Sequence, residues 1–168
     1  SQSISVTTAG TYFVTITDPN GCSGSIVHNL TVNPLPVAAF AATSNCLGSA
    51  SVFTNQSSIS SGSIASYNWT FGDTYSSASA NTSHTYASDG AYTATLNLTS
   101  NAGCTASISQ TVQVYPLPVA AFSAPTVCRT TATTFTNASS ISSGSITNWS
   151  WNFGDNGNST LASPSHTY

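Results

Sequence analysis

The sequence predicts an all-β chain built from tandem antiparallel β-sandwiches. Apolar residues alternate with polar ones along several segments, which is the pattern of strands with one buried face. Gly- and Asn-containing turns separate these segments, and none of them shows the 3.6-residue spacing of an amphipathic helix. Long stretches of sequence also return one domain length later, so the chain repeats a small two-layer unit.

The repeat divides the chain at two proline-containing linkers. Three stretches recur in order: PLPVAAF (34–40 and 116–122), SSISSGSI (57–64 and 139–146) and SHTY (83–86 and 165–168). Proline fixes φ and donates no backbone hydrogen bond, so each PLP indicates a short, stiff linker. We therefore predict the C-terminal part of one domain at 1–33, a complete domain at 34–115 and the N-terminal part of another at 116–168.

Within the complete domain the alternation predicts which face of each strand is buried. Tyr67, Trp69 and Phe71 share one face and have polar residues between them. Residues 92–98 and 106–114 alternate in the same way, and turns at SSGS, FGD, SDG and SNAG separate the strands. About seven strands around one modest core are expected for a unit of this size.

The first segment has apolar residues on both faces of one strand. Tyr12, Val14 and Ile16 share a face, whereas Phe13 points to the opposite one. Phe13 is therefore either an exposed contact residue or the sign of a sheet that is covered on both faces. We favour a contact with a neighbouring domain or subunit.

The composition excludes several classes of function. Hydrophobic residues make up 39% of the chain and the mean hydropathy is +0.05, which is typical of a globular protein. Only 3% of residues are charged, and Arg129 is the single basic residue, so a nucleic-acid partner is excluded. No apolar run reaches the ~20 residues of a membrane span, and the first residues do not resemble a signal peptide. A surface with so little charge must either pack against copies of itself or be covered by a hydrophilic group such as glycan.

The letters of a hydrolase triad occur in the sequence, but their repetition favours a structural role. Asp73 precedes Ser83 and His84, and the same three residue types return at 155, 165 and 166. A whole constellation that is duplicated in tandem is typical of a fold motif, so we expect no enzyme activity. We expect Asp73 to accept backbone N–H bonds in the turn after its strand, and His84 to contact that turn. The four aspartates are dispersed, so neither a calcium site nor any other metal or cofactor is expected.

W-x-F-G-D, then S-H-T-Y, then D-G-x-Y and a proline linker resemble the PKD (polycystic kidney disease) domain, an immunoglobulin-like sandwich. The resemblance covers 34–115 fully and 116–168 as a truncated copy, and it departs from the family where Thr74 and Asn156 follow FGD in place of Gly. Residues 3–33 are more similar to the last strands of a bacterial immunoglobulin-like repeat. The resemblance implies that the following residues are fold signatures: Trp69, Phe71, Gly72, Asp73, His84, Tyr86, Tyr92, Trp151, Phe153, Gly154, Asp155, His166 and Tyr168. Tyr92 is expected to form the tyrosine corner. The implied protein is a secreted bacterial surface protein whose modules act as spacers, adhesive arms or partner-binding units, without catalysis.

Four cysteines in a Ser/Thr-rich chain predict disulfides rather than a zinc site, because no Cys-x-x-Cys or histidine pair is present. Cys22 and Cys104 are related by the repeat, as are Cys46 and Cys128. Cys46 and Cys104 are expected at opposite ends of one sandwich, beyond the ~7 Å Cα span of a disulfide. Bonds between successive domains or between neighbouring subunits are therefore favoured.

Eight asparagines stand in N-x-S/T sequons and are candidates for glycosylation. They are Asn29, Asn55, Asn68, Asn81, Asn97, Asn137, Asn148 and Asn158. Strand parity points Asn29, Asn68, Asn97 and Asn148 away from the core, where a sugar can be attached. Covalent glycans, N- or O-linked, would supply the hydration that the missing charges do not.

Incomplete sandwiches at both ends predict a partner for each of them. Either the chain continues into a longer tandem array, or copies join head to tail and one completes the next by strand complementation. We favour the long array and expect an extracellular, non-catalytic structural protein of a surface fibre or filament. The alternative is an adhesin stalk or an ancillary module of a secreted enzyme, which binds glycan or protein through exposed aromatics such as Phe13, Tyr75 or Tyr115.

Overall fold

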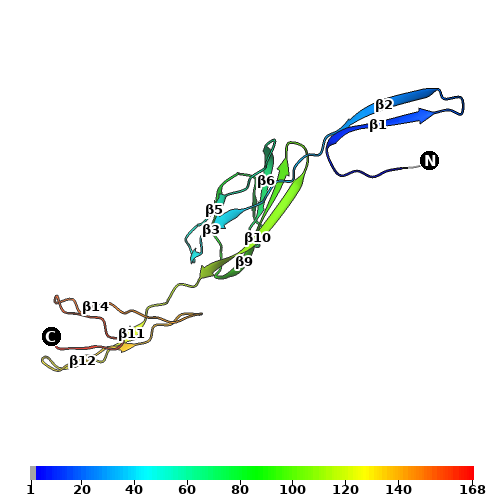
Figure 1. The fold of residues 1–168 in the computed structure, drawn as a ribbon. Helices are drawn as coiled ribbons and strands as arrows, with labels where there is room; N and C mark the ends of the chain where they lie inside the picture. Colours follow the sequence, from blue (N-terminus) through cyan, green and yellow to red (C-terminus); the bar gives the residue numbers. More distant parts are fainter. Residues whose placement is uncertain (1–2) are drawn as a thin grey trace.

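The computed structural model describes residues 3–168 and contains strands, bends and turns. Three parts follow one another along an elongated molecule: an N-terminal hairpin, a central module (34–115) and a C-terminal module (116–168) (Figure 1). The all-β prediction is confirmed, because residues 3–168 contain no helix. This range therefore lacks any helix long and apolar enough to cross a membrane. Residues 1 and 2, which belong to the first predicted domain, lie outside the described range.

The central module is a two-layer sandwich of eight strands. They are β3 (Phe40–Ala42), β4 (Asn45–Cys46), β5 (Ser51–Asn55), β6 (Ile64–Thr70), β7 (Ser76–Ser77), β8 (Thr82–His84), β9 (Gly90–Ser100) and β10 (Thr105–Tyr115). One sheet has the strand order β3-β5-β8 and the other β4-β10-β9-β6-β7. Neighbouring strands are antiparallel, except that β10 and β4 are parallel.

Aromatic side chains from both sheets form the core of this module. Trp69 is fully buried and lies edge-on to Phe40, with ring centroids 5.0 Å apart, and 5.6 Å from the ring of Phe53. Its indole N–H donates to the carbonyl of Ser79 at 2.9 Å, so its polar atom is satisfied inside the protein. The face of β6 that the alternation predicted to be apolar is therefore the buried face.

The N-terminal hairpin consists of β1 (Gly10–Thr17) and β2 (Ser23–Leu30), which pair only with each other within the described residues. Its turn repeats the turn between β9 and β10. The N–H of Asp18 donates to the carbonyl of Cys22 at 2.9 Å, as the N–H of Ser100 donates to the carbonyl of Cys104 at 2.8 Å. The side chain of Asp18 also accepts the Cys22 N–H, as that of Ser100 accepts the Cys104 N–H.

The base of the hairpin repeats the central module as well. The Tyr12 hydroxyl donates to the carbonyl of Thr8 at 2.7 Å, and the Tyr92 hydroxyl donates to the carbonyl of Ser88 at 3.0 Å. In both cases the acceptor lies four residues before the tyrosine. The hairpin is thus a slightly shorter version of β9–β10, the last two strands of the central module.

The C-terminal module has six short strands, which repeat β3, β5, β6, β7 and β8 of the central module; the counterpart of β5 is divided in two, and β4 has no counterpart. They are β11 (Phe122–Ser123), β12 (Thr133–Thr134), β13 (Thr136–Asn137), β14 (Trp151–Asn152), β15 (Asn158–Ser159) and β16 (Ser165–His166). They pair as β11-β13, β12-β16 and β14-β15. Residues 146–150 correspond to the first part of β6 but form no strand, because the described chain has no second β9 to pair with them.

The expectation of disulfides is wrong for the described residues, where Cys22, Cys46, Cys104 and Cys128 are all free thiols. The fold keeps them apart. Cys46 is the backbone partner of Tyr115, at the end of the central module that precedes the second linker. Cys104 lies at the opposite end, beside the first linker, with its Sγ 3.9 Å from the carbonyl of Asn33. No cysteine therefore meets another within one chain.

Candidate functional site

A cluster of hydrogen-bonded polar groups in the central module lies at the turn that follows β6. Gly72 adopts a φ of +88° there, and the N–H of Phe71 donates to the carbonyl of Tyr75 at 3.3 Å. Oδ1 of Asp73 accepts the N–H of Tyr75 at 3.3 Å, and Oδ2 lies 2.6 Å from Nε2 of His84. The carboxylate thus links the turn to β8 in the other sheet.

His84 is enclosed by aromatic rings. Its imidazole stacks on Phe71 with centroids 4.5 Å apart and an interplanar angle of 7°, and it meets Tyr86 edge-on at 4.7 Å. Both His84 and Asp73 are mostly buried, so the pair is a packed part of the module. Ser83, the third member of the triad pattern, is adjacent to His84 on β8 and is exposed on the other face, so no nucleophile reaches the imidazole.

The same arrangement occurs in the C-terminal module. Nε2 of His166 lies 2.7 Å from Oδ2 of Asp155, and the imidazole stacks on Phe153 with centroids 4.3 Å apart. The Tyr168 hydroxyl donates to the carbonyl of Phe153 at 3.2 Å. The hydrogen bond from His166 lowers the pKa of Asp155, and the N–H of Gly157 adds to this effect. The duplication supports a structural role for both sets.

Tyr86 joins this cluster to the core. Its buried hydroxyl donates to the carbonyl of Phe71 at 3.1 Å, and its ring stacks on Tyr92 with centroids 4.0 Å apart. Burial raises the pKa of Tyr86 to about 12, and the charges of Asp73 and Tyr92 act in the same direction. The phenol is therefore held protonated as a hydrogen-bond donor and does not serve as a base.

We expect the central module to lose stability as the pH rises from about 10 to about 12. The pKa of Tyr86 is raised to about 12 in the folded state, whereas a tyrosine in the unfolded chain titrates near 10. The stabilisation is therefore complete below pH ~10 and decreases by about 2 kcal/mol as the pH rises through the folded pKa. Urea unfolding at several pH values, followed by the tryptophan emission maximum, measures this loss.

Tyr86→Phe is the control for this pH dependence. It removes the hydroxyl and its hydrogen bond to Phe71, so it should cost about 1 kcal/mol at neutral pH. The variant should also lose most of the alkaline dependence. If the stability of the variant decreased equally steeply with rising pH, the effect would belong to another group.

The two residues that follow the FGD motifs have strained backbone conformations. Thr74 has a φ of +83° and Asn156 a φ of +72°. Positive φ is unfavourable for a β-branched residue, is tolerated better by Asn and is freely adopted by Gly. We expect Thr74→Gly to stabilise the central module by about 1 kcal/mol and Asn156→Gly to have a smaller effect. Thermal unfolding measures both, and an unchanged or lower melting temperature for Thr74→Gly would contradict this account.

A metal site is not assembled among residues 3–168, where no three His, Cys, Asp or Glu side chains come close enough to share an ion. Asp18 is used in its own turn, where Oδ1 accepts the N–H groups of Asn20 and Cys22. Asp89 is exposed before β9.

The sequon asparagines lie at or near the surface. Six are exposed, and Asn55 and Asn137 are half-buried because each side chain accepts the N–H of the serine two residues later. The aromatic residues considered as ligand contacts, Phe13, Tyr75 and Tyr115, are all exposed. Phe13 lies opposite Val27 on the face of the hairpin that Tyr12 does not share.

Both modules have the same arrangement of Trp, Gly-Asp, His and Tyr. The comparison of the chain with protein-family models agrees with this repeat. The PKD domain model matches residues 31–116 and again residues 114–168. The chain belongs to the PKD domain family. PKD domains are non-catalytic modules.

Solved PKD domains are similar to one module of this chain. The PKD1 domain of Vibrio anguillarum Epp is 32% identical over 49% of this chain and 96% of its own, with a TM-score of 0.47. The PKD1 domain of the Vibrio cholerae metalloprotease PrtV is 32% identical over 49% of this chain and 98% of its own, with a TM-score of 0.44. No curated protein matches the chain significantly.

A third structure shares the fold at lower identity. It comes from work on the promiscuous specificity of carbohydrate-binding modules of the β-sandwich superfamily. It is 22% identical over 63% of this chain and 56% of its own, with a TM-score of 0.50.

The sequence carries a signal for the hairpin that the longer repeated stretches do not include. Gly10-x-Tyr12 and Gly21-Cys22 have the same residue types as Gly90-x-Tyr92 and Gly103-Cys104 of the central module. A groove in the C-terminal module, lined by Phe122, Phe135 and Trp151 among others, was not expected from the sequence.

Proposed function

We propose that this chain is a non-catalytic arm of an extracellular protein, serving as a stalk or as an ancillary region that holds other domains at a distance. One observation carries the proposal. The Asp-His-Tyr sets of both modules have the same geometry, and every member is bonded to the turn or strand of its own module. Because these side chains are occupied by hydrogen bonds within their own module, each module contributes its length and its surface to the protein.

The linkers support a stiff arm. Pro36 is buried, and the N–H of Val37 donates to the carbonyl of Ser58 at 2.7 Å, which ties the end of the first linker to the central module. The N–H of Val119 donates to the carbonyl of Ser140 at 2.8 Å in the same way. Only a few residues between successive modules are therefore free to bend.

Small-angle X-ray scattering of the 168-residue chain at low concentration tests the arm. We expect a largest dimension that fits the elongated outline of Figure 1 and a broader distance distribution for the double variant Pro34→Gly, Pro36→Gly. The matched Pro116→Gly, Pro118→Gly variant tests the second linker. A compact particle in which the modules fold back on one another would contradict the proposal.

The surface chemistry supports an extracellular location and covalent glycans as part of this proposal. Charged residues are almost absent, and the exposed sequon asparagines offer attachment points. Protease treatment of intact source cells should remove the modules if they are outside. Glycopeptides at these asparagines in a mass-spectrometric map of the native protein would support the glycans, and unmodified peptides at all of them would refute the N-linked ones.

Carbohydrate binding at Tyr75 is the second candidate function. Tyr75 is 65% exposed and lies 5.3 Å from the imidazole of His84, so the ring is held next to a packed cluster. The corresponding position of the C-terminal module is Gly157, which shows that the fold does not require an aromatic residue there. The compared carbohydrate-binding modules make glycans the first ligands to test. Affinity electrophoresis on polysaccharides should show retention that Tyr75→Ala abolishes and Tyr115→Ala preserves.

A further inference from the structure

The loop between β5 and β6 has a sequence, SSISSGSI, that the C-terminal module repeats without change. Its first two serines hold the loop against the first linker. Oγ of Ser57 accepts the N–H of Ala39 at 3.0 Å and donates to the carbonyl of the same residue, also at 3.0 Å. The N–H of Ser58 donates to the carbonyl of Val37 at 3.0 Å. Ser57 therefore has a structural role, and the loop is anchored beside the linker.

The C-terminal module anchors its copy of the loop in the same way. Oγ of Ser139 accepts the N–H of Ala121 and donates to its carbonyl, both at 3.1 Å. The N–H of Ser140 donates to the carbonyl of Val119 at 2.9 Å. The glycine of each loop has a φ of +88°. The two loops therefore share one conformation as well as one sequence.

The other three serines of the loop have no such role. Ser60, Ser61 and Ser63 are exposed, and their hydroxyl groups have no hydrogen-bond partner among the residues that the structure describes. The backbone N–H of Ser63 donates to Oδ1 of Asn101 at 3.2 Å, which leaves its hydroxyl free. The equivalent serines of the C-terminal module are also exposed: Ser142, Ser143 and Ser145.

Exposed positions elsewhere differ between the two modules. Tyr75 of the central module is replaced by Gly157, and Asn68 is replaced by Ser150. Such differences are expected where neither packing nor a hydrogen bond depends on the side chain. The three exposed serines of the loop are the same in both modules although nothing in the fold requires them. A role outside the fold accounts for this identity.

The loop is also the place where a modifying enzyme can reach a serine in the folded module. A transferase must bind the acceptor segment in its own cleft, and a paired strand can enter a cleft only by losing its backbone hydrogen bonds. Thr95 and Ser109, for example, lie on the paired strands β9 and β10 and are bonded to each other at 2.8 Å. Residues 60–62 form a bend outside any strand, so their side chains are presented without unfolding.

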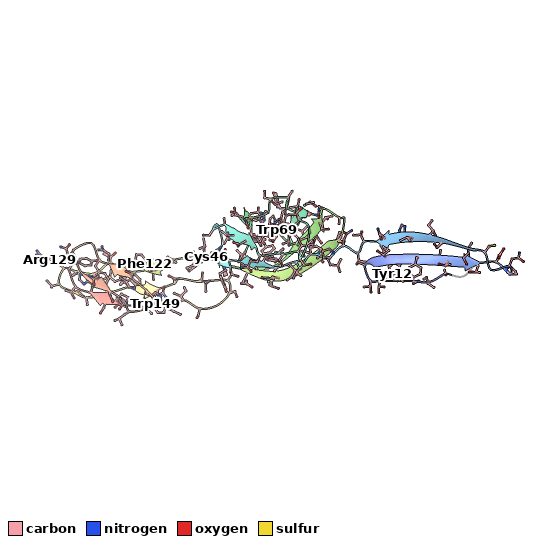
Figure 2. The ribbon with its side chains drawn as sticks, turned by 45° about the horizontal axis from the view of Figure 1, so that its top comes forward. Tyr12, Cys46, Trp69, Phe122, Arg129 and Trp149 are labelled. Atoms are coloured by element: carbon pink, nitrogen blue, oxygen red, sulfur yellow. The ribbon has the colours of Figure 1, made fainter. Side chains whose placement is uncertain are left out.

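The surroundings of the loop favour a neutral modification over a phosphate. Residues 57–64 contain no charged side chain. A phosphoserine is stabilised by nearby arginine or lysine, and Arg129 is the single basic residue of the chain. Figure 2 shows Arg129 near one end of the molecule, away from the central module that Trp69 marks. A covalently bound sugar needs no such partner.

We propose that these exposed serines of the SSISSGSI loops carry O-linked glycans, with at least one sugar on each loop. In this reaction Oγ of a serine attacks the anomeric carbon of a sugar that is activated as a nucleotide or lipid phosphate ester. The new bond joins this carbon to Oγ, the bond to the phosphate breaks, the phosphate leaves with the electron pair, and a base of the transferase takes the hydroxyl proton. The inference rests on the proposed extracellular location, and it places glycans on loop serines, which the sequons do not include.

A glycan on this loop would cover apolar surface of the linker. Leu35 is 69% exposed and Val37 is 63% exposed, and Val37 forms a β-bridge with Ser58 of the loop. The second linker has the same exposed pair, Leu117 and Val119, and the same bridge. Sugars on the adjacent serines would therefore hydrate a part of each module that has exposed apolar side chains and no charge.

Peptide mapping of the native protein from its source cells tests the proposal. Chymotrypsin is the suitable protease, because the chain has a single basic residue. Cleavage after Phe53 and Tyr67 releases one loop in the peptide 54–67, and cleavage after Phe135 and Trp149 releases the other in 136–149. We expect both peptides to carry the added mass of a hexose or an N-acetylhexosamine. Electron-transfer fragmentation should locate it on the exposed serines.

The sequons at Asn55 and Asn137 lie in the same two peptides, so the type of linkage must be established. We expect the added mass to resist peptide N-glycosidase. Mild alkali should remove it by β-elimination and leave dehydroalanine at the modified serines. Unmodified serines in both loops, sugar on the asparagines alone, or a phosphate on the serines would each overturn the proposal. None of these results affects the stiff arm, which X-ray scattering tests separately.

Two sets of substitutions, expressed in the source cells, separate modification from folding. The triple variant Ser60→Ala, Ser61→Ala, Ser63→Ala should lose the added mass from the first loop and keep it on the second. Made in a host without the transferase, it should melt at the same temperature as the unmodified parent chain. The matched variant Ser57→Ala should keep the added mass and melt at a lower temperature, because it loses both bonds to Ala39. An added mass that survives on the first loop of the triple variant, or a lower melting temperature for that variant, would contradict the proposal.

Discussion

Trp69→Ala is expected to destabilise the central module by about 3–5 kcal/mol. Trp69 is fully buried between the two sheets and contacts Phe40 and Phe53 at centroid distances of 5.0 and 5.6 Å. Truncation leaves a cavity that these rings cannot fill, and it leaves the carbonyl of Ser79 without its indole donor. Hydrogen exchange read by mass spectrometry measures the loss for each module separately.

Trp151→Ala is the matched control for this cavity. Trp151 makes the same contacts with Phe122 and Phe135, at 5.3 and 5.7 Å, but it lines the open groove and is only half-buried. Its loss should therefore cost less than half as much. Equal costs at the two positions would contradict the view that the smaller burial of Trp151 lowers its contribution to stability.

Gly72→Ala is expected to cost the central module roughly 3 kcal/mol. Gly72 has a φ of +88°, which alone costs about 1–2 kcal/mol for a residue with a Cβ. The added Cβ would also lie 2.9 Å from both the N and the O of Thr93, so β9 would have to shift away from the turn. Thermal and urea unfolding of the variant measure this cost.

Gly154→Ala separates the two contributions. Gly154 has the same φ of +88°, but its Cβ would meet nothing within 4 Å. Only the backbone term should remain, about 1–2 kcal/mol in the C-terminal module. A cost at Gly72 no larger than that at Gly154 would rule out the contact with β9 as the reason for glycine.

Much of the fold could be predicted from the sequence because it rests on local patterns. The two-residue alternation of Tyr67, Trp69 and Phe71 predicted which face of β6 is buried, since neighbouring side chains of a strand point to opposite sides. The repeat placed the same residue types at equivalent positions of two modules. For this reason the family assignment was within reach of the sequence.

The role of Asp73 and His84 could be assigned only from the geometry. The letters Asp73, Ser83 and His84 fit a triad as well as a turn, and only the structure shows Asp73 against His84 with Ser83 on the other face. The equivalence of the hairpin to β9–β10 is weak in sequence, because the hairpin is shorter and its apolar residues differ. The equivalence is clear from the backbone hydrogen bonds of the two turns.

The sequence by itself determined the all-β architecture, the repeat and the non-catalytic family, since these follow from alternation, turn residues and recurring motifs. Only the tertiary structure decided that all four cysteines lie apart and that Gly72 faces the backbone of Thr93. It also decided that Phe122, Phe135 and Trp151 line an open groove in the C-terminal module. The physical reason is that these features depend on distances between segments far apart along the chain, which local residue preferences do not encode.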